Sequence, residues 1–255
     1  MSTEGRQGST VEVCFCGTAD AFCSGGHLQA SYVVRGPRST LLLDCGATLL
    51  SSLKRHAIAP DEIEIVAISH LHGDHFGGLP FLLLEFLYRT PRTRPLTVCG
   101  PPGTAERVPA LFAALYRDVG TRPLPFPLRY VELLPDQEVA LPDGLLRAFR
   151  VPHQEREVSL GYRVEVEGRS IVYSGDTGWT EALIDVSAGS DLFICECSFF
   201  ATRVDNHLDY RRLADHAHRF ATRRLVLTHL GEEVLQRRSA MELELAFDGL
   251  RVALA

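Results

Sequence analysis

The sequence predicts an α/β protein. Strand-like runs rich in Val, Ile and Leu alternate with helical patterns along the chain, and no low-complexity linker interrupts them. The 255 residues, of which 45% are hydrophobic, are sufficient for a large core. We therefore expect a polar N-terminal tail at residues 1–10 and a single domain over residues 11–255, in which helices cover sheets.

The expected strands are short apolar runs bounded by glycine, proline or polar turns. In chain order they cover residues 11–16, 29–35, 40–44, 63–68, 96–99, 129–134, 145–151, 161–167, 170–174, 191–195, 225–228, 243–247 and 250–254. The expected helices show apolar residues at helical spacing. They cover residues 49–56, 79–88, 104–119 and 210–221.

The expected helix at residues 79–88 is apolar nearly all round, with Pro80 in its first turn, where proline is tolerated. Such a helix is buried on several sides. It is either a core helix or a subunit interface, and a homodimer formed through it is one expectation.

Charge and composition exclude some classes of protein. The net charge of −6 argues against a protein that coats nucleic acid through bulk positive charge. No apolar run has the length of a membrane span, and the N-terminus lacks the apolar core of a signal peptide, so we expect a cytoplasmic protein without membrane contact. The seven cysteines include two C-x-C pairs inside strand patterns, which we interpret as structural thiols.

Three imidazoles and one carboxylate lie within six consecutive residues, from His70 to His75, directly after a strand-like run. If the chain stays extended through His72, the two-residue period of a strand places His70 and His72 on one side. Asp74 and His75 are adjacent, so we expect them to point in different directions and to suit a second ligand set. Imidazole with carboxylate is the ligand chemistry of zinc and other divalent transition metals, and the alternative is a His-rich surface loop.

Three later segments each place a polar ligand type at the end of an apolar strand, at His153, Asp176 and His229. A rigid sheet can present such groups from distant parts of the chain at one point. Taken singly, each residue is more often structural, for example an Asp that holds a turn. Their joint occurrence after the His-rich stretch indicates a metal site.

The stretch from His70 to His75, followed by these three residues, resembles the metallo-β-lactamase superfamily over nearly the whole chain. The resemblance implies a four-layer αββα sandwich (the metallo-β-lactamase fold) with two divalent metal ions at one edge, Zn²⁺ or else Mn²⁺ or Fe²⁺. By the same resemblance, the first metal would be held by His70, His72 and His153, the second by Asp74, His75 and His229, and both by a bridging Asp176.

The C-terminal part is most similar to the ribonuclease Z and phosphodiesterase branch, in residues 161–164, 174–177, 196–199 and 206–208. In that branch the His corresponding to His207 contacts phosphate or protonates the leaving group, and the Glu corresponding to Glu196 orients it. The tRNA-processing enzymes also carry a long arm before the residue that matches Asp176. Here a tight turn at residues 167–169 leaves no room for that arm, which argues against tRNA 3′-end processing.

We predict a dinuclear metal-dependent hydrolase that uses a metal-bridging hydroxide. The first hypothesis is a phosphodiesterase acting on a small nucleotide, cyclic phosphate or RNA end. In it Asp74 also accepts the nucleophile's proton and His207 stabilises the leaving oxygen. The alternatives are a lactone, thioester or β-lactam hydrolase on the same site, and a non-catalytic metal-binding protein.

Two further regions carry weaker expectations. The Pro-rich segment at residues 89–127 is expected to shape the mouth of the pocket. Its Arg89, Arg92 and Arg94 fit a solvated charged loop, and the alternative is that they grip an anionic substrate. His27 follows two glycines in a loop that could approach the site, which makes it a candidate substrate contact.

Overall fold

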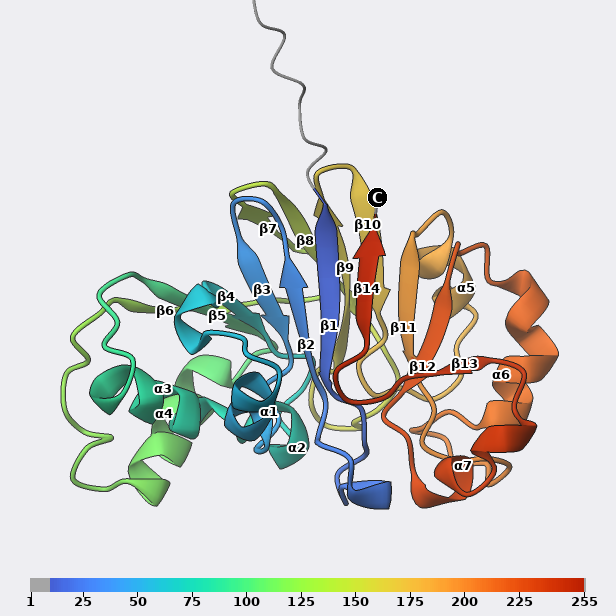
Figure 1. Cartoon of the computed structure of the whole chain (residues 1–255), viewed down its shortest axis with the longest axis horizontal. Helices are drawn as coiled ribbons and strands as arrows, with labels where there is room; N and C mark the ends of the chain where they lie inside the picture. Colours follow the sequence, from blue (N-terminus) through green and yellow to red (C-terminus); the bar gives the residue numbers. More distant parts are fainter. Residues whose placement is uncertain (1–9, 255) are drawn as a thin grey trace, which may run out of the picture.

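The computed structural model describes residues 10–254, so that the expected tail at residues 1–10, apart from Thr10, lies outside the described residues. Two seven-stranded sheets pack against each other, and helices cover the outer side of each (Figure 1). This is the predicted αββα sandwich.

The first sheet has the strand order β14-β1-β2-β3-β4-β5-β6. Strands β14 to β3 pair antiparallel and β3 to β6 pair parallel. The parallel half therefore ends its strands at one edge, where the first ligand residues follow β4. The strands are β1 (Val11–Gly17), β2 (Ser31–Arg35), β3 (Thr40–Leu43), β4 (Ile65–Ala67), β5 (Leu96–Gly100), β6 (Leu128–Glu132) and β14 (Arg251–Leu254).

The second sheet has the order β13-β12-β11-β10-β9-β8-β7 and is antiparallel from β7 to β10 and parallel from β10 to β13. Val166 pairs with Arg169, so β9 and β10 form the predicted tight hairpin and no arm separates them. The strands are β7 (Glu138–Leu141), β8 (Gly144–Arg150), β9 (Leu160–Val166), β10 (Arg169–Tyr173), β11 (Leu192–Glu196), β12 (Leu225–Thr228) and β13 (Glu244–Leu245).

Helices α1 to α4 cover the first sheet and α5 to α7 the second (Figure 1). None of those in the described residues is long and apolar enough to cross a bilayer. The sequence patterns missed β7, α2, α5 and α7, since these elements span six residues or fewer, which is too short for a periodic pattern to repeat clearly. The helices are α1 (Leu49–Arg55), α2 (Gly73–Phe76), α3 (Leu79–Tyr88), α4 (Thr104–Leu115), α5 (Ala182–Ser187), α6 (Tyr210–His216) and α7 (Glu232–Leu235).

Two expected helices end earlier than predicted. The expected helix at 104–119 stops as α4 at Leu115, and the one at 210–221 stops as α6 at His216 and continues as a 3-10 turn, η3 (Ala217–Arg219). The apolar periodicity continued past both ends because the following residues still pack against the core, as Phe220 does.

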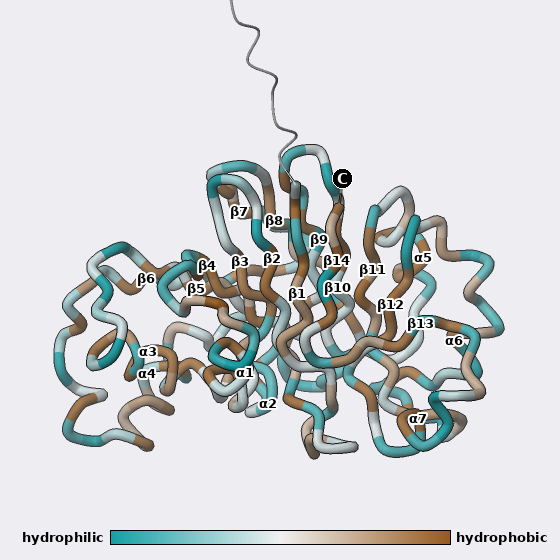
Figure 2. The backbone as a smooth tube through the Cα atoms, viewed as in Figure 1, coloured by the Kyte–Doolittle hydropathy of each residue, from teal (hydrophilic) through white to brown (hydrophobic). Residues whose placement is uncertain are grey.

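Three apolar layers fill the sandwich. One lies between the two sheets, the second between the first sheet and α1, α3 and α4, and the third between the second sheet and α5 and α6. Figure 2 shows the corresponding hydrophobic colour along the inner strands. The seven cysteines are free, and both C-x-C pairs are buried in these layers, as predicted for structural thiols.

Helix α3 belongs to the core of this chain. Leu79, Leu82, Leu83 and Phe86 are buried in the layer against the first sheet, while Tyr88 at the end of the helix is 59% exposed. The helix is therefore explained by packing within one chain, and a homodimer formed through residues 79–88 stays a prediction.

Arg92 corrects the expectation of a solvated charged loop. Its side chain is buried, and the guanidinium donates to the carbonyl oxygens of Arg94 and Pro95 and to Asp61. The buried charge is thereby hydrogen-bonded on several sides, as such a group must be. Arg92 is a structural residue.

We expect Leu146→Ala to lower the free energy of unfolding by about 2–5 kcal/mol, because the side chain of Leu146 is fully buried between the two sheets. Leu134→Ala is the matched control, since Leu134 is 50% exposed. Urea denaturation of both variants and of the wild type measures the difference. Equal stabilities of the two variants would contradict the packing of the central layer.

Candidate functional site

The predicted ligand residues come together at one edge of the sandwich, the lower edge in Figure 1, where α2 lies. They come from both sheets: the connection after β4 and helix α2 supply four, and the ends of β8, β10 and β12 supply one each. The residues are His70, His72, Asp74, His75, His153, Asp176 and His229.

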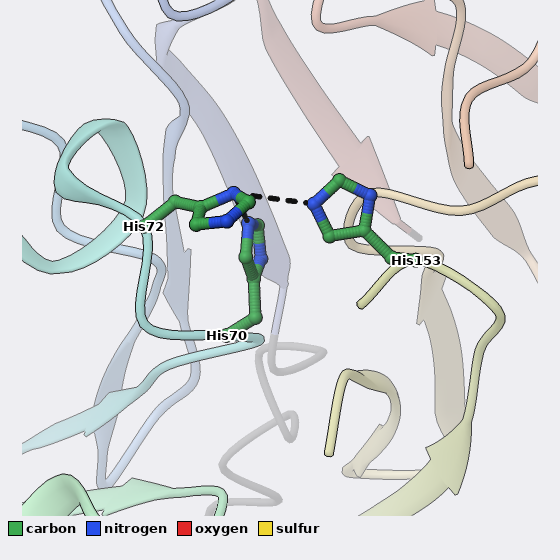
Figure 3. A group of neighbouring side chains, drawn as sticks. All are labelled: His70, His72 and His153. Atoms are coloured by element: carbon green, nitrogen blue, oxygen red, sulfur yellow. Dashed lines mark hydrogen bonds between the residues drawn. The ribbon is translucent and has the colours of Figure 1, made fainter. Parts of the chain in front are cut away.

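The first cluster consists of three imidazoles (Figure 3). His72 Nδ1 lies 2.9 Å from His70 Nε2 and 3.2 Å from His153 Nε2. Nitrogen ligands about 2.0–2.1 Å from a tetrahedral zinc ion would be about 3.3 Å apart. The spacing of the three nitrogens therefore fits one divalent cation.

The second cluster contains Asp74, His75, Asp176 and His229. His75 Nε2 lies 3.2 Å from Asp74 Oδ2, and His229 Nε2 lies 3.3 Å from the same oxygen. Asp74 and His75 lie together in this second cluster and outside the first, as expected, although their side-chain tips converge. Both lie on the one-turn helix α2, where neighbouring side chains are about 100° apart and their tips can still meet.

Asp176 lies between the two clusters. Its Oδ2 is 3.2 Å from His75 Nε2 and 3.4 Å from His229 Nε2, and 3.9 Å from both His70 Nε2 and His153 Nε2. Its Oδ1 is buried without a hydrogen-bond partner. The preceding Gly175 has φ +61, and a Cβ there would lie 2.6 Å from the carbonyl oxygen of Leu160, so the turn that delivers Asp176 requires glycine.

Outer hydrogen bonds determine which ring nitrogen faces the clusters. Four histidines engage Nδ1 outward and leave Nε2 inward, whereas His72 engages Nε2 with Gln154 and leaves Nδ1 inward. Outward partners of this kind orient metal-binding imidazoles. The Nδ1 pairs are His70 with Ser69 Oγ (3.0 Å), His75 with Asp44 Oδ2 (2.7 Å), His153 with the Asn206 carbonyl (2.9 Å) and His229 with Ser198 Oγ (3.0 Å).

The second cluster carries excess negative charge. Asp44, Asp74 and Asp176 are buried around His75, and no Arg or Lys among residues 10–254 forms an ion pair with them. Burial disfavours the His75 imidazolium, but the three carboxylates outweigh it and raise the pKa of His75 well above its usual range. Buried carboxylates need such compensation, and divalent cations supply it. The donor set thus fits two divalent metal ions.

His229 and His70 are perturbed in opposite directions. Burial works against the charged form of His229, but Asp176 and Asp74 raise its pKa to about 9. Burial and the nearby His75 lower the pKa of His70 well below its usual range. The first cluster therefore offers neutral imidazole, which is the form that binds metal.

His207 lies beside both clusters and is held by Glu196. Its Nδ1 is 2.9 Å from Glu196 Oε1, so Nε2 is the ring atom left for a ligand. Burial lowers the pKa of His207, but the hydrogen bond and charge of Glu196 outweigh it and raise the pKa overall. Glu196 is fully buried and also accepts from the backbone of Thr177, Ser198 and Leu208, so it positions His207 and stays away from the pocket.

A pocket of about 410 Å³ opens onto the clusters. Asp74, Asp176, His207 and His229 line it together with residues of the loop at 20–24 and with Gly231 and the first turn of α7, which the sequence patterns did not indicate. The expectation for residues 89–127 is wrong for this pocket, because none of them lines it. The pocket lining omits His27 as well, whose Nδ1 lies 3.5 Å from Asp248 Oδ1.

Comparisons with known proteins place the chain in a family and support the fold. The family model of the anti-Pycsar protein Apyc1 matches residues 11–247. Ribonuclease Z of Agathobacter rectalis is 28% identical in an alignment of 278 positions that covers 89% of each chain. The short form of human tRNase Z superposes with a TM-score of 0.78 at 25% identity, over 96% of this chain and 99% of that one. A metallo-β-lactamase fold protein of Bacillus subtilis, YhfI, also gives 0.78, at 20% identity over 96% and 100%.

We expect Asp44→Asn to weaken zinc binding by about 10- to 100-fold, the usual effect of removing an outer partner of a ligand. Asp44 accepts from Ser69 N and Oγ, His75 Nδ1 and Tyr173 Oη, so one of these donors would face the new amide NH₂. Asp44 has φ 55, a conformation that Asn tolerates, so the backbone is not expected to change. Competition with a chromophoric chelator measures the affinity.

Asp215→Asn is the control for this variant, because Asp215 is exposed on α6. It removes the same charge far from the ligands. An Asp44→Asn protein that binds zinc as tightly as the control would contradict the role of Asp44 in orienting His75.

Proposed function

Since this chain belongs to the anti-Pycsar protein Apyc1 family, we propose that it is a dinuclear metal-dependent phosphodiesterase acting on a small nucleotide. One observation carries the proposal: His207, which Glu196 holds from behind through a hydrogen bond, lies on the wall of the pocket that also exposes Asp74 and Asp176. A proton donor beside a two-metal ligand set is what cleavage of a phosphodiester with a poor leaving group requires.

The proposed ligands are assigned by cluster. His70, His72 and His153 would hold one ion, Asp74, His75 and His229 the other, and Asp176 both. When bound, the ions supply Lewis acidity toward phosphoryl oxygens and lower the pKa of water, and Zn²⁺ is the first candidate for this ligand set, with Mn²⁺ or Fe²⁺ as alternatives.

Two side chains of the pocket would act on the substrate. Asp74, which lines the pocket, would accept a hydrogen bond from the attacking water and so orient it and receive its proton. As the new P–O bond forms and the ester P–O bond breaks, His207 Nε2 gives a proton to the leaving oxygen. The products are a phosphomonoester and an alcohol, or one phosphomonoester if the ester was cyclic. Glu196 stabilises the protonated ring from its outer side.

Three features favour a small nucleotide over an RNA chain. The pocket of about 410 Å³ lies within the size range of small-molecule sites. The tight β9–β10 hairpin replaces the arm of the tRNA-processing enzymes. Finally, the net charge of −6 gives no broad attraction for a polyanion.

We expect His207→Ala to lower kcat by about 100- to 10,000-fold on a phosphodiester with an alkoxide leaving group. The loss should be much smaller on bis(p-nitrophenyl) phosphate, because p-nitrophenolate leaves without a proton. Steady-state kinetics on both substrates, with metal analysis of the same preparations, measures this difference.

His218→Ala is the matched control, since His218 is exposed and lies outside the pocket. Equal losses on the two substrates, or loss of metal together with activity, would contradict the role of His207 as a proton donor.

A substrate panel tests the reaction class. We expect the metal-loaded protein to hydrolyse a phosphodiester at least about 100-fold faster than a lactone or a thioester of similar size, and to lose this activity with a chelator and regain it with Zn²⁺ or Mn²⁺. Preference for a carbonyl substrate would support the carboxylic-ester alternative. Inactivity on every class with both metals bound would support a binding protein.

A further inference from the structure

Phe22 is an exposed aromatic residue at the mouth of the pocket. Its side chain is 87% exposed, the largest value among the exposed large hydrophobic residues of the described chain, and it lines the pocket that contains Asp74 and His207. Single exposed apolar residues are common on protein surfaces. The exposure of Phe22 therefore indicates a binding role only if the structure holds Phe22 in place at the mouth of the pocket.

The loop that carries Phe22 is held rigidly. Asp20 Oδ1 accepts from the backbone N–H groups of Phe22 and Ser24, each at 3.1 Å, and Asp20 Oδ2 accepts from Ser24 Oγ at 2.8 Å. Cys23 adopts a left-handed conformation with φ 54, which turns the chain sharply after Phe22. The backbone of Phe22 is thus fixed by a buried carboxylate.

Helix α7 supports the same loop from outside. Glu232 Oε2 accepts from the backbone N–H of Gly25 at 3.2 Å, and a Cβ on Gly25 would lie 2.8 Å from Leu235 Cδ1. Because the loop is tied to a second element, its backbone would lose little further conformational entropy when a ligand binds to the exposed ring of Phe22.

The pocket has a second aromatic ring and an acidic rim. Phe199 lines it, with its ring centroid 6.1 Å from that of His207. Asp20, Glu232 and Glu233 also line it, and each already accepts hydrogen bonds from the protein. Such a rim repels additional phosphates and offers no free donor, so it suits an uncharged, flat, apolar-faced group.

We propose that Phe22 is the stacking platform for the nucleobase of a mononucleotide whose single phosphate would lie at the divalent ions proposed for the two ligand clusters. The inference rests on the proposed phosphodiesterase function and adds the part of the substrate that is bound away from the reacting atoms. A base over Phe22 contributes affinity through its π-face, and every base has one. Phe22 is thereby a specificity residue that distinguishes nucleotides from base-free phosphodiesters.

The test compares ligands with and without a base. For turnover, the pair is adenosine 3′,5′-cyclic phosphate and methyl riboside 3′,5′-cyclic phosphate. For binding, calorimetry on the zinc-loaded protein uses adenosine 5′-monophosphate and ribose 5-phosphate. We expect Phe22→Ala to reduce the preference for the base-bearing member of each pair by about 10-fold, and Phe22→Trp to restore it.

Tyr88→Ala is the control, because Tyr88 is an exposed aromatic residue on α3 outside the pocket. It should leave both preferences unchanged. The proposal is overturned if Phe22→Ala leaves both preferences as in the wild type, or if it lowers turnover of both cyclic phosphates equally and shifts the sedimentation coefficient, which would assign Phe22 to a subunit contact.

The binding measurement separates this inference from the proposed function. If the wild type hydrolyses neither cyclic phosphate but binds adenosine 5′-monophosphate more tightly than ribose 5-phosphate through Phe22, the platform is supported and the phosphodiesterase proposal fails. If it hydrolyses both without any preference that depends on Phe22, the platform fails and the phosphodiesterase proposal stands.

Discussion

One buried carboxylate, Asp44, joins both sheets to the ligand clusters. Its oxygens accept from Ser69 and His75, on the connection that leaves β4, and from Tyr173 at the end of β10 in the other sheet. A buried carboxylate without hydrogen-bond donors would strongly destabilise the fold. Asp44 and its donors therefore hold each other in position. The His75 imidazole is therefore oriented by contacts from both halves of the sandwich, and the relative position of the two sheets is part of the geometry of the site.

The convergence of the candidate ligand residues could be predicted from the sequence because most of them follow apolar strands, and strand ends at one edge are recognisable from the pattern. Phe22 could not, because a single aromatic residue in a turn has no period, and Glu232, which supports its loop, lies 207 residues beyond Gly25. For Arg92 the sequence pattern was misleading. Its charge suggested a solvent-exposed side chain, but the side chain is buried, and one of its partners is Asp61, 31 residues earlier, which no local pattern reveals.

Two residues of the site have strained backbones. Asp44 (φ 55) and His229 (φ 53) occupy the left-handed region, where a non-glycine residue costs about 1–3 kcal/mol. Both side chains are buried and hydrogen-bonded, and three well-packed apolar layers surround them. The packed scaffold thus holds both residues in this conformation, and with them the positions of the Asp44 and His229 side chains in the candidate site.

The β9–β10 hairpin also has a consequence for affinity. An arm that grips a remote part of a large substrate makes binding at the active site partly intramolecular, at effective concentrations on the order of millimolar. Residues 10–254 offer no such second grip at this position. For a dissociation constant of about 1 μM, contacts inside the pocket alone would have to supply about 8 kcal/mol. The affinity for a ligand that fits within the pocket does not depend on such an arm. A polymer, in contrast, gains no affinity here from the parts of its chain that lie outside the pocket.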